Sequence, residues 1–151
     1  MKIRDQLFIG GEWVNGPKKI RVHNPADGEV LAEVVSAETA DVHRAIDSAR
    51  RSFADGAWSN MLPRMRAGVL SKAADLIEAR MEEFALLETL NVGKPIKESR
   101  HVDVASMIDT LRYYASISDV LDGQHVPVGD GIVDFTRREP LGVVGLITPW
   151  N

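Results

Sequence analysis

The chain has 151 residues, of which 44% are hydrophobic and 26% charged, a balance typical of a folded globular protein. The net charge is −4, and the 18 basic residues are scattered rather than clustered, which argues against a nucleic-acid-binding surface. Cysteine is absent, so disulfides, thiolate metal sites and a cysteine nucleophile are excluded within this chain.

The first expected elements are short antiparallel strands. Residues 7–9 and 12–14 flank Gly10-Gly11, a pair that favours a two-residue hairpin. Residues 21–23 and 29–35 predict two further strands, separated by the turn sequence NPADG. The start of the chain lacks the apolar core of a signal peptide, and the sequence has no run of roughly eighteen apolar residues. We therefore expect a cytoplasmic protein without a membrane segment.

A helical block follows these strands. The first helix is expected after a cap at Ser36 or Thr39, with Glu38 and Asp41 near its positive end. Its apolar residues recur at helical spacing, as they do in two of the three later helices. The predicted apolar faces are Val42, Ala45, Ile46, Ala49 and Phe53 in the first helix, Val69, Ala73 and Leu76 in the second, and Val104, Ile108, Leu111 and Ala115 in the fourth.

The second helix is expected over residues 64–80, and the third over residues 82–90, where Gly93 and Pro95 supply a stop. The fourth helix ends before Asp122-Gly123.

The last part of the chain predicts a β-ribbon and then a buried strand. Residues 126–128 and 132–138 form the ribbon around Gly129-Asp130-Gly131. Residues 141–147 are almost wholly apolar, and the sequence Thr-Pro-Trp then breaks the run. This order of elements suggests an α/β architecture whose parallel sheet begins near the end of the chain, where ligands bind beyond strand ends.

Several local sequences lack a functional motif that they partly resemble. Gly129-Asp130-Gly131 lacks the third glycine of a dinucleotide fingerprint, and Gly93-Lys94-Pro95 lacks the residues of a phosphate loop. No two of the four histidines have metal-ligand spacing. Arg64 and Arg66 could bind an anion, although ion pairs with acidic helices are the simpler reading. Acidic residues such as Glu78, Glu82, Glu83 and Glu88 are expected on solvated helix faces.

Five sequence blocks, in their order and separation, resemble the amino-terminal third of the NAD(P)-dependent aldehyde dehydrogenases. The resemblance covers essentially the whole chain. The blocks are residues 8–13 (FIGGEW), 24–29 (NPADGE), 88–95 (ETLNVGKP), 112–115 (RYYA) and 138–151, which end in ITPWN.

The resemblance implies an amino-terminal part of a cofactor-binding domain at residues 1–122, an oligomerisation arm at 123–140 and the first strand of a Rossmann-like parallel sheet at 141–151. An ordinary hairpin packed on its own domain is the alternative reading of the arm. The resemblance also implies a homo-oligomer, without a choice between dimer and tetramer. The fold class is therefore α/β, consisting of β-hairpins, a helical block, a ribbon and this first strand.

The resemblance also implies the site residues. Ile147, Thr148, Pro149 and Trp150 match positions that bind NAD or NADP, and Asn151 matches the residue whose amide donates to the oxyanion of the reacting aldehyde. Such a preorganised donor is worth about 3–4 kcal/mol in the transition state. Some family members hold a monovalent cation near positions matching Val22 and Asn91, but Asn91 replaces a frequent Asp, so we predict no metal.

The family's catalytic cysteine, general-base glutamate and ribose-binding lysine match no position in this chain. We therefore expect the chain to be the amino-terminal portion of an enzyme that oxidises an aldehyde to a carboxylic acid, and to be inactive alone. A catalytically inactive module that pairs with full-length subunits is the alternative. We further expect the uncovered strand around residues 143–146 to promote aggregation. Neither the aldehyde nor the choice between NAD and NADP follows from the sequence.

Overall fold

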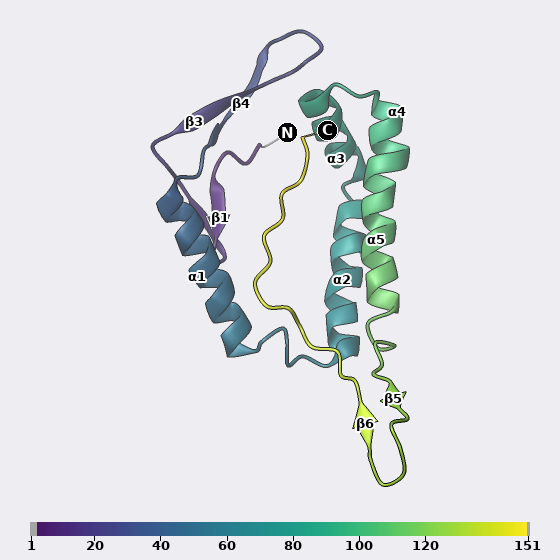
Figure 1. The fold of residues 1–151 in the computed structure, drawn as a ribbon. Helices are drawn as coiled ribbons and strands as arrows, with labels where there is room; N and C mark the ends of the chain where they lie inside the picture. Colours follow the sequence, from purple (N-terminus) through teal and green to yellow (C-terminus); the bar gives the residue numbers. More distant parts are fainter. Residues whose placement is uncertain (1–2, 151) are drawn as a thin grey trace.

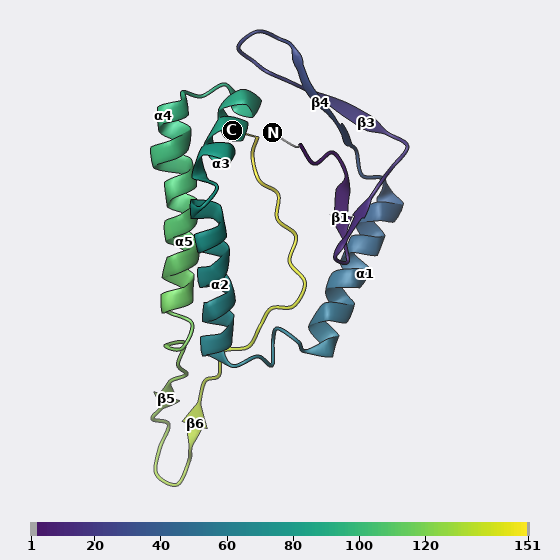
Figure 2. The same cartoon turned by 180° about the vertical axis from the view of Figure 1, so that it is seen from behind.

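The computed structural model describes residues 3–150, which form two β-hairpins, a helical block, a β-ribbon and an extended final segment (Figure 1). The hairpins and helix α1 lie on one side and the helical block lies on the other, as the reverse view also shows (Figure 2). The ribbon projects away from both. No described helix is long and apolar enough to cross a membrane.

The two predicted hairpins are confirmed. Strand β1 (Leu7–Ile9) pairs antiparallel with β2 (Glu12–Val14), and β3 (Lys19–His23) pairs with β4 (Val30–Val35). Gly10 and Gly11 have φ values of 63° and 87°, which only glycine adopts readily in succession, so this dipeptide fixes the first turn.

The turn between β3 and β4 is held by its own polar side chains. The Asn24 amide donates to Asp27 at 2.8 Å, and its oxygen accepts from the N–H of Ala26 at 3.1 Å. The backbone N–H of Gly28 donates to the Asn24 carbonyl at 2.7 Å. These contacts are the Asx-type turn that the NPADG sequence predicts.

Helix α1 (Thr39–Asp55) forms where it was predicted, but its cap differs. The N-cap is Glu38, not Ser36 or Thr39. The Glu38 backbone N–H donates to the Asp41 carboxylate at 2.9 Å, and Arg44 pairs with the other Asp41 oxygen at 2.5 Å. Asp41, the third residue of the helix, thus provides a hydrogen-bond acceptor for the backbone N–H of the N-cap residue. Ser36 and Thr39 do not make this contact.

The helical block consists of α2 (Pro63–Glu78), α3 (Met81–Val92), the short α4 (Ile96–Glu98), the π-helical turn η1 (Ser99–Val104) and α5 (Ala105–Ser116). The predicted fourth helix is therefore a longer, continuous helical run containing a π-helical turn. Gly93, with φ of 77°, ends α3 as predicted. The block's core consists of Ala74, Ala85, Val104 and Ile108, with Ile77, Met81, Phe84 and Leu111 packed against it.

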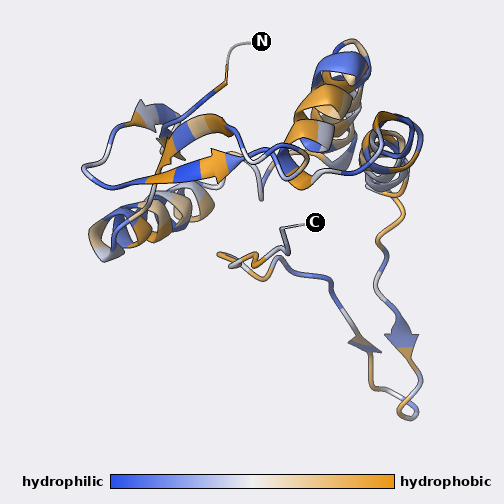
Figure 3. Cartoon of the chain, turned by 90° about the horizontal axis from the view of Figure 1, so that it is seen from above, coloured by the Kyte–Doolittle hydropathy of each residue, from blue (hydrophilic) through white to orange (hydrophobic). Residues whose placement is uncertain are grey.

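Two of the predicted apolar faces are not buried. Val69 and Leu76 of α2 are exposed, because this helix packs on α5 through Ala74 and Ile77 instead. Val42, Ile46 and Phe53 of α1 are exposed as well. The apolar face predicted for the fourth helix is confirmed, since Val104 of η1 and Ile108 and Ala115 of α5 are buried. Figure 3 shows the hydrophobic residues of these helices from above. An amphipathic stripe predicts which face is apolar, but not whether a described element covers it.

The end of the chain differs most from the prediction. The ribbon forms as a hairpin, but its strands are only β5 (His125–Val126) and β6 (Asp134–Phe135). The buried strand predicted over residues 141–147 is not formed among the described residues. This segment has no strand pairing, and Leu141 and Ile147 are 94% and 101% exposed. A parallel strand needs hydrogen-bonded neighbours, and no described strand lies beside it.

Candidate functional site

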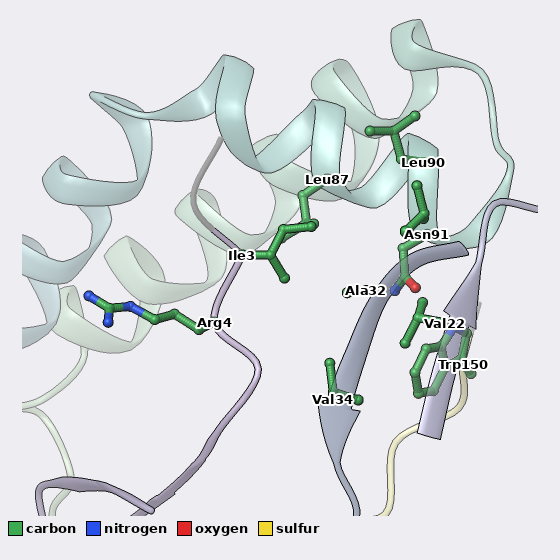
Figure 4. Close-up of a pocket in the computed structure, with 10 residues that line it drawn as sticks. Ile3, Arg4, Val22, Ala32, Val34, Leu87, Leu90, Asn91 and Trp150 are labelled. Carbon is green, nitrogen blue, oxygen red and sulfur yellow. The ribbon is translucent and has the colours of Figure 1, made fainter. Parts of the chain in front are cut away.

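An apolar cavity of about 200 Å³ lies between the β3–β4 hairpin, helix α3 and the end of the chain. Figure 4 shows how these elements surround it. Its walls are mostly aliphatic, and Arg4 and Asn91 are the polar residues among those that line it. The lining residues most relevant to function are Val22, Val34, Leu87, Leu90, Asn91 and Trp150.

Regular secondary structure aligns the lining residues. Val22 pairs with Ala32 across the β3–β4 hairpin, so the two side chains share one face of this hairpin. Val34 follows two residues later on the same face. Leu87, Leu90 and Asn91 are spaced by three and four residues in α3, which puts them on one side of that helix. The hairpin and the helix thus contribute one surface each.

The Asn91 amide is a polar feature of the cavity. Its Oδ1 atom is buried and accepts no hydrogen bond from any described residue. In Figure 4 the amide points toward the side of the cavity that Val22 and Trp150 line. A buried carbonyl oxygen without a donor costs about 1–3 kcal/mol, so this atom has an unmet capacity for a hydrogen bond.

The end of α3 that carries Asn91 is held firmly. The Lys94 ammonium lies 2.8 Å from Asp103 and 3.6 Å from Glu88, and the hydrogen bond to Asp103 raises the pKa of Lys94. The Thr89 hydroxyl donates to the Ser99 hydroxyl at 2.9 Å, and Ser99 is completely buried. These contacts join α3 to the π-helical turn and fix the position from which the Asn91 side chain extends.

The predicted cofactor-binding residues do not all lie in one place. Ile147, Thr148 and Pro149 are exposed on the extended segment and do not line the cavity. Trp150 does line it, although 66% of this residue remains accessible to solvent. Asn151, the predicted oxyanion donor, lies outside the described residues.

Other residues singled out from the sequence have structural contacts. Gly129 and Gly131 lie in the loop of the ribbon, and Arg66 donates to the Met61 carbonyl. The acidic residues are on helix exteriors, where Glu78 pairs with Arg112, Glu82 with Arg100, Glu83 with Arg80 and Glu88 with Lys94. Among residues 3–150 no three His, Cys, Asp or Glu side chains are grouped so that they could hold a metal ion.

Sequence reasoning did not find the cavity. Val22 and Asn91 entered only through the family resemblance, and the hydrogen bond between Thr89 and Ser99 was not foreseen. The usable signal is weak: Asn91 stands on the same helical face as Leu87, where a polar residue interrupts an apolar pattern. No local pattern indicates that the β3–β4 hairpin lies opposite this face.

The comparisons with known proteins agree with one another. Residues 13–151 match the aldehyde dehydrogenase family. The chain is 44% identical to the aminoacetaldehyde dehydrogenase of Pseudomonas aeruginosa, over 100% of this chain and 31% of that protein. The structure resembles that of the aldehyde dehydrogenase KauB from P. aeruginosa with a TM-score of 0.95 at 39% identity, covering 99% of this chain and 31% of KauB.

The NAD+ complex of an aldehyde dehydrogenase from Bacillus cereus is similar as well, with a TM-score of 0.87 at 37% identity over 92% of this chain and 29% of that one. The chain thus spans about a third of the length of the proteins that it matches. The family match covers nearly every residue, and the fold agrees with that of the amino-terminal part of the solved enzymes. The chain belongs to the aldehyde dehydrogenase family.

Proposed function

We propose that this chain is the amino-terminal part of an enzyme that oxidises an aldehyde to a carboxylic acid with NAD or NADP. The observation that carries the proposal is the match over the full chain, at 44% identity, to an aminoacetaldehyde dehydrogenase. The aldehyde itself stays open, because the chain spans 31% of that relative.

The segment before Asn151 fits one end of such a cofactor. Ile147 presents an apolar side chain to solvent, and Thr148 adds a hydroxyl. An exposed apolar side chain beside a hydroxyl group suits a flat ring with polar edges. Ile147, Thr148, Pro149 and Trp150 would hold the cofactor there, and the cofactor would supply the hydride acceptor.

Asn151 would donate its side-chain amide to the oxygen of the aldehyde as negative charge develops on it. A neutral amide stabilises this charge without delivering a proton, so the oxyanion can re-form its C=O bond while the hydrogen on the same carbon leaves as hydride. The nucleophile must come from elsewhere, because the chain contains no cysteine. We therefore expect the isolated chain to be inactive.

The inactivity is tested by mixing the purified chain with NAD or NADP and a panel of aldehydes. We expect no reduction of the cofactor, and robust reduction would contradict this.

The oxidation itself is tested in a chimera that joins residues 1–151 to the remaining two-thirds of the P. aeruginosa relative. The chimera should oxidise aldehydes, and Asn151→Ala should lower kcat by about 10²–10³. Asn15→Ala, in an exposed loop, is the control. A chimera that folds but oxidises no aldehyde would overturn the proposal.

A second candidate function rests on the ribbon, which projects from the rest of the chain (Figures 1 and 2). Its strands are two residues long, and Val133 and Phe135 are 79% and 68% exposed. An exposed apolar β-edge is suited to pairing with another chain. In this reading the chain is a catalytically inactive module that pairs with full-length subunits. In the first reading the same arm joins subunits into a homo-oligomer.

Co-purification with a full-length homologue separates these readings from an ordinary hairpin. We expect the chain to co-purify with the homologue, and Phe135→Lys to abolish this by placing a charge in the contact. His23→Lys, on a strand of the β3–β4 hairpin, is the control for an added charge elsewhere. No association of the unmodified chain would remove the pairing reading.

A further inference from the structure

The cavity beside Asn91 is large enough to bury more of the Trp150 ring than it buries in this structure. An enclosed apolar cavity of about 150 Å³ is enough to bind benzene. The cavity here is about 200 Å³, and Trp150 already forms part of its wall while remaining 66% exposed. The indole ring therefore stands at a site of suitable size and polarity.

The polar groups are complementary as well. Asn91 Oδ1 is a buried acceptor to which no residue among 3–150 donates, and an indole N–H is a donor that accepts nothing. The aliphatic walls from Val22, Val34 and Leu87 suit the body of the ring. Figure 4 shows the Asn91 amide and the Trp150 ring directed toward the same part of the cavity.

We propose that Trp150 is a positioning residue whose indole seats in the cavity between β3, β4 and α3 and donates its N–H to Asn91 Oδ1. In this arrangement only the backbone of Trp150 is left to contact the cofactor beside Ile147, Thr148 and Pro149. Its ring faces the hairpin and α3, which leaves the exposed side of the segment to the other three residues.

The ring is a useful anchor because Asn91 is itself held in place. Lys94, between Glu88 and Asp103, joins the end of α3 to the π-helical turn, and the bond from Thr89 to Ser99 adds a second connection. When the Trp150 ring is seated, it restricts the positions open to the next residue, Asn151. The catalytic meaning of that link rests on the proposed function, whereas the seating of the ring does not.

Indole hydrogen exchange followed by NMR tests the seating in the chain itself. The chain has three tryptophans, and Trp150→Phe identifies the Trp150 signal. We expect its N–H to exchange about tenfold more slowly than in the urea-unfolded chain, the protection that one net hydrogen bond provides. Asn91→Leu should remove this protection, and Asn91→Asp, which keeps an acceptor, should retain it.

The Trp58 indole serves as an internal control, and Asn15→Leu serves as the control substitution. A Trp150 proton that exchanges as fast as in urea would overturn the proposal. It would also be overturned if Asn91→Leu folds and leaves the Trp150 exchange unchanged, because the Asn91 oxygen would then serve another partner.

Cross-linking provides a second measurement if Asn91→Leu does not fold. Because the chain has no cysteine, Val34→Cys combined with Pro149→Cys introduces the only two thiols and keeps both Trp150 and Asn91. A short thiol-bridging reagent should link this pair, since Val34 lines the cavity and Pro149 precedes the seated residue, and adding Trp150→Ala should lower the linking. Equal linking with and without Trp150→Ala would overturn the proposal. Neither measurement needs cofactor or aldehyde, so an inactive chimera would leave the seating intact.

Discussion

The helical block and the final segment contain comparably apolar sequences but differ completely in burial. In the block, Ile108 of α5 is 3% exposed and packs with Ala74 and Ala85 from two other helices. In the final segment, Leu146 and Ile147 are 85% and 101% exposed. The block makes its hydrogen bonds within each helix and brings its own packing partners. Among the described residues, the segment has neither hydrogen-bonded strand neighbours nor a packed core.

This difference shows what each kind of element requires. A helix satisfies its backbone locally, so α2, α3 and α5 need only one another to form a core. A buried parallel strand needs neighbours for its backbone and cover for both faces. The final segment has a strand's composition, but no described element supplies these partners, and residues 143–150 are extended without strand pairing.

The largest effect that tests this comparison should come from the core. Ile108→Ala is expected to lower the free energy of unfolding by about 2–5 kcal/mol, because it leaves a cavity among Ala74, Ala85 and Val104. Ile147→Ala should change it by less than about 0.5 kcal/mol, because the side chain is exposed. Urea denaturation followed by circular dichroism measures both. Equal losses would show that the final segment is packed in solution.

The next largest effect concerns two glycines that should respond with opposite signs. Gly93 has φ of 77°, and an added Cβ would lie 2.6 Å from Pro25 Cγ. Gly93→Ala should therefore destabilise the chain by roughly 1–3 kcal/mol. Gly68 lies inside α2 with open space around it, so Gly68→Ala should stabilise the chain by about 0.5–1 kcal/mol. Thermal melting distinguishes the signs, and a stabilising Gly93→Ala would contradict the close packing of α3 on the β3–β4 turn.

A smaller, pH-dependent effect is expected at the start of α1. The hydrogen bond from the Glu38 N–H, assisted by Arg44, lowers the pKa of Asp41. A lowered folded-state pKa adds stability that is present above the usual range near pH 4 and is lost as the pH falls through the lowered value. Asp41→Asn should therefore destabilise the chain at neutral pH, and the difference from the unmodified chain should vanish in acid. Thr39→Ala, which changes an exposed residue without an ionisable group at the start of the same helix, is the control.

The smallest effect on stability should accompany a large effect on association. Leu146→Lys should leave the free energy of unfolding unchanged within about 0.5 kcal/mol, because Leu146 is exposed. It should nevertheless reduce aggregation, since a charge interrupts an uncovered apolar segment with high β-propensity. Light scattering measures the aggregation, with Val69→Lys on α2 as the control for an added charge. Unchanged aggregation would mean that another apolar surface drives it.

Local sequence signals were sufficient where one element decides the outcome. Gly10-Gly11 fixed the first turn, NPADG the second, and Gly93 the end of α3. The same signals failed where two elements must meet. The α2 stripe through Val69 and Leu76 is apolar, yet the helix packs through Ala74 and Ile77 because those small and branched residues face α5.

The candidate site divides in the same way. Ile147, Thr148, Pro149 and Trp150 stay a prediction from a motif that is contiguous in sequence, and Asn151 lies outside the described residues. The cavity between the β3–β4 hairpin and α3 could not be found, because its two surfaces are far apart along the chain and neither has a distinctive pattern.

The sequence by itself determined the family, the turns and the long helices, because these depend on motifs and on hydrogen bonds between neighbouring residues. Only the tertiary structure decided which helix faces are buried, that no described strand pairs with the final segment, and that Trp150 and Asn91 line one cavity. The physical reason is that burial and strand pairing require a second surface, and the position of that surface is a property of the whole fold.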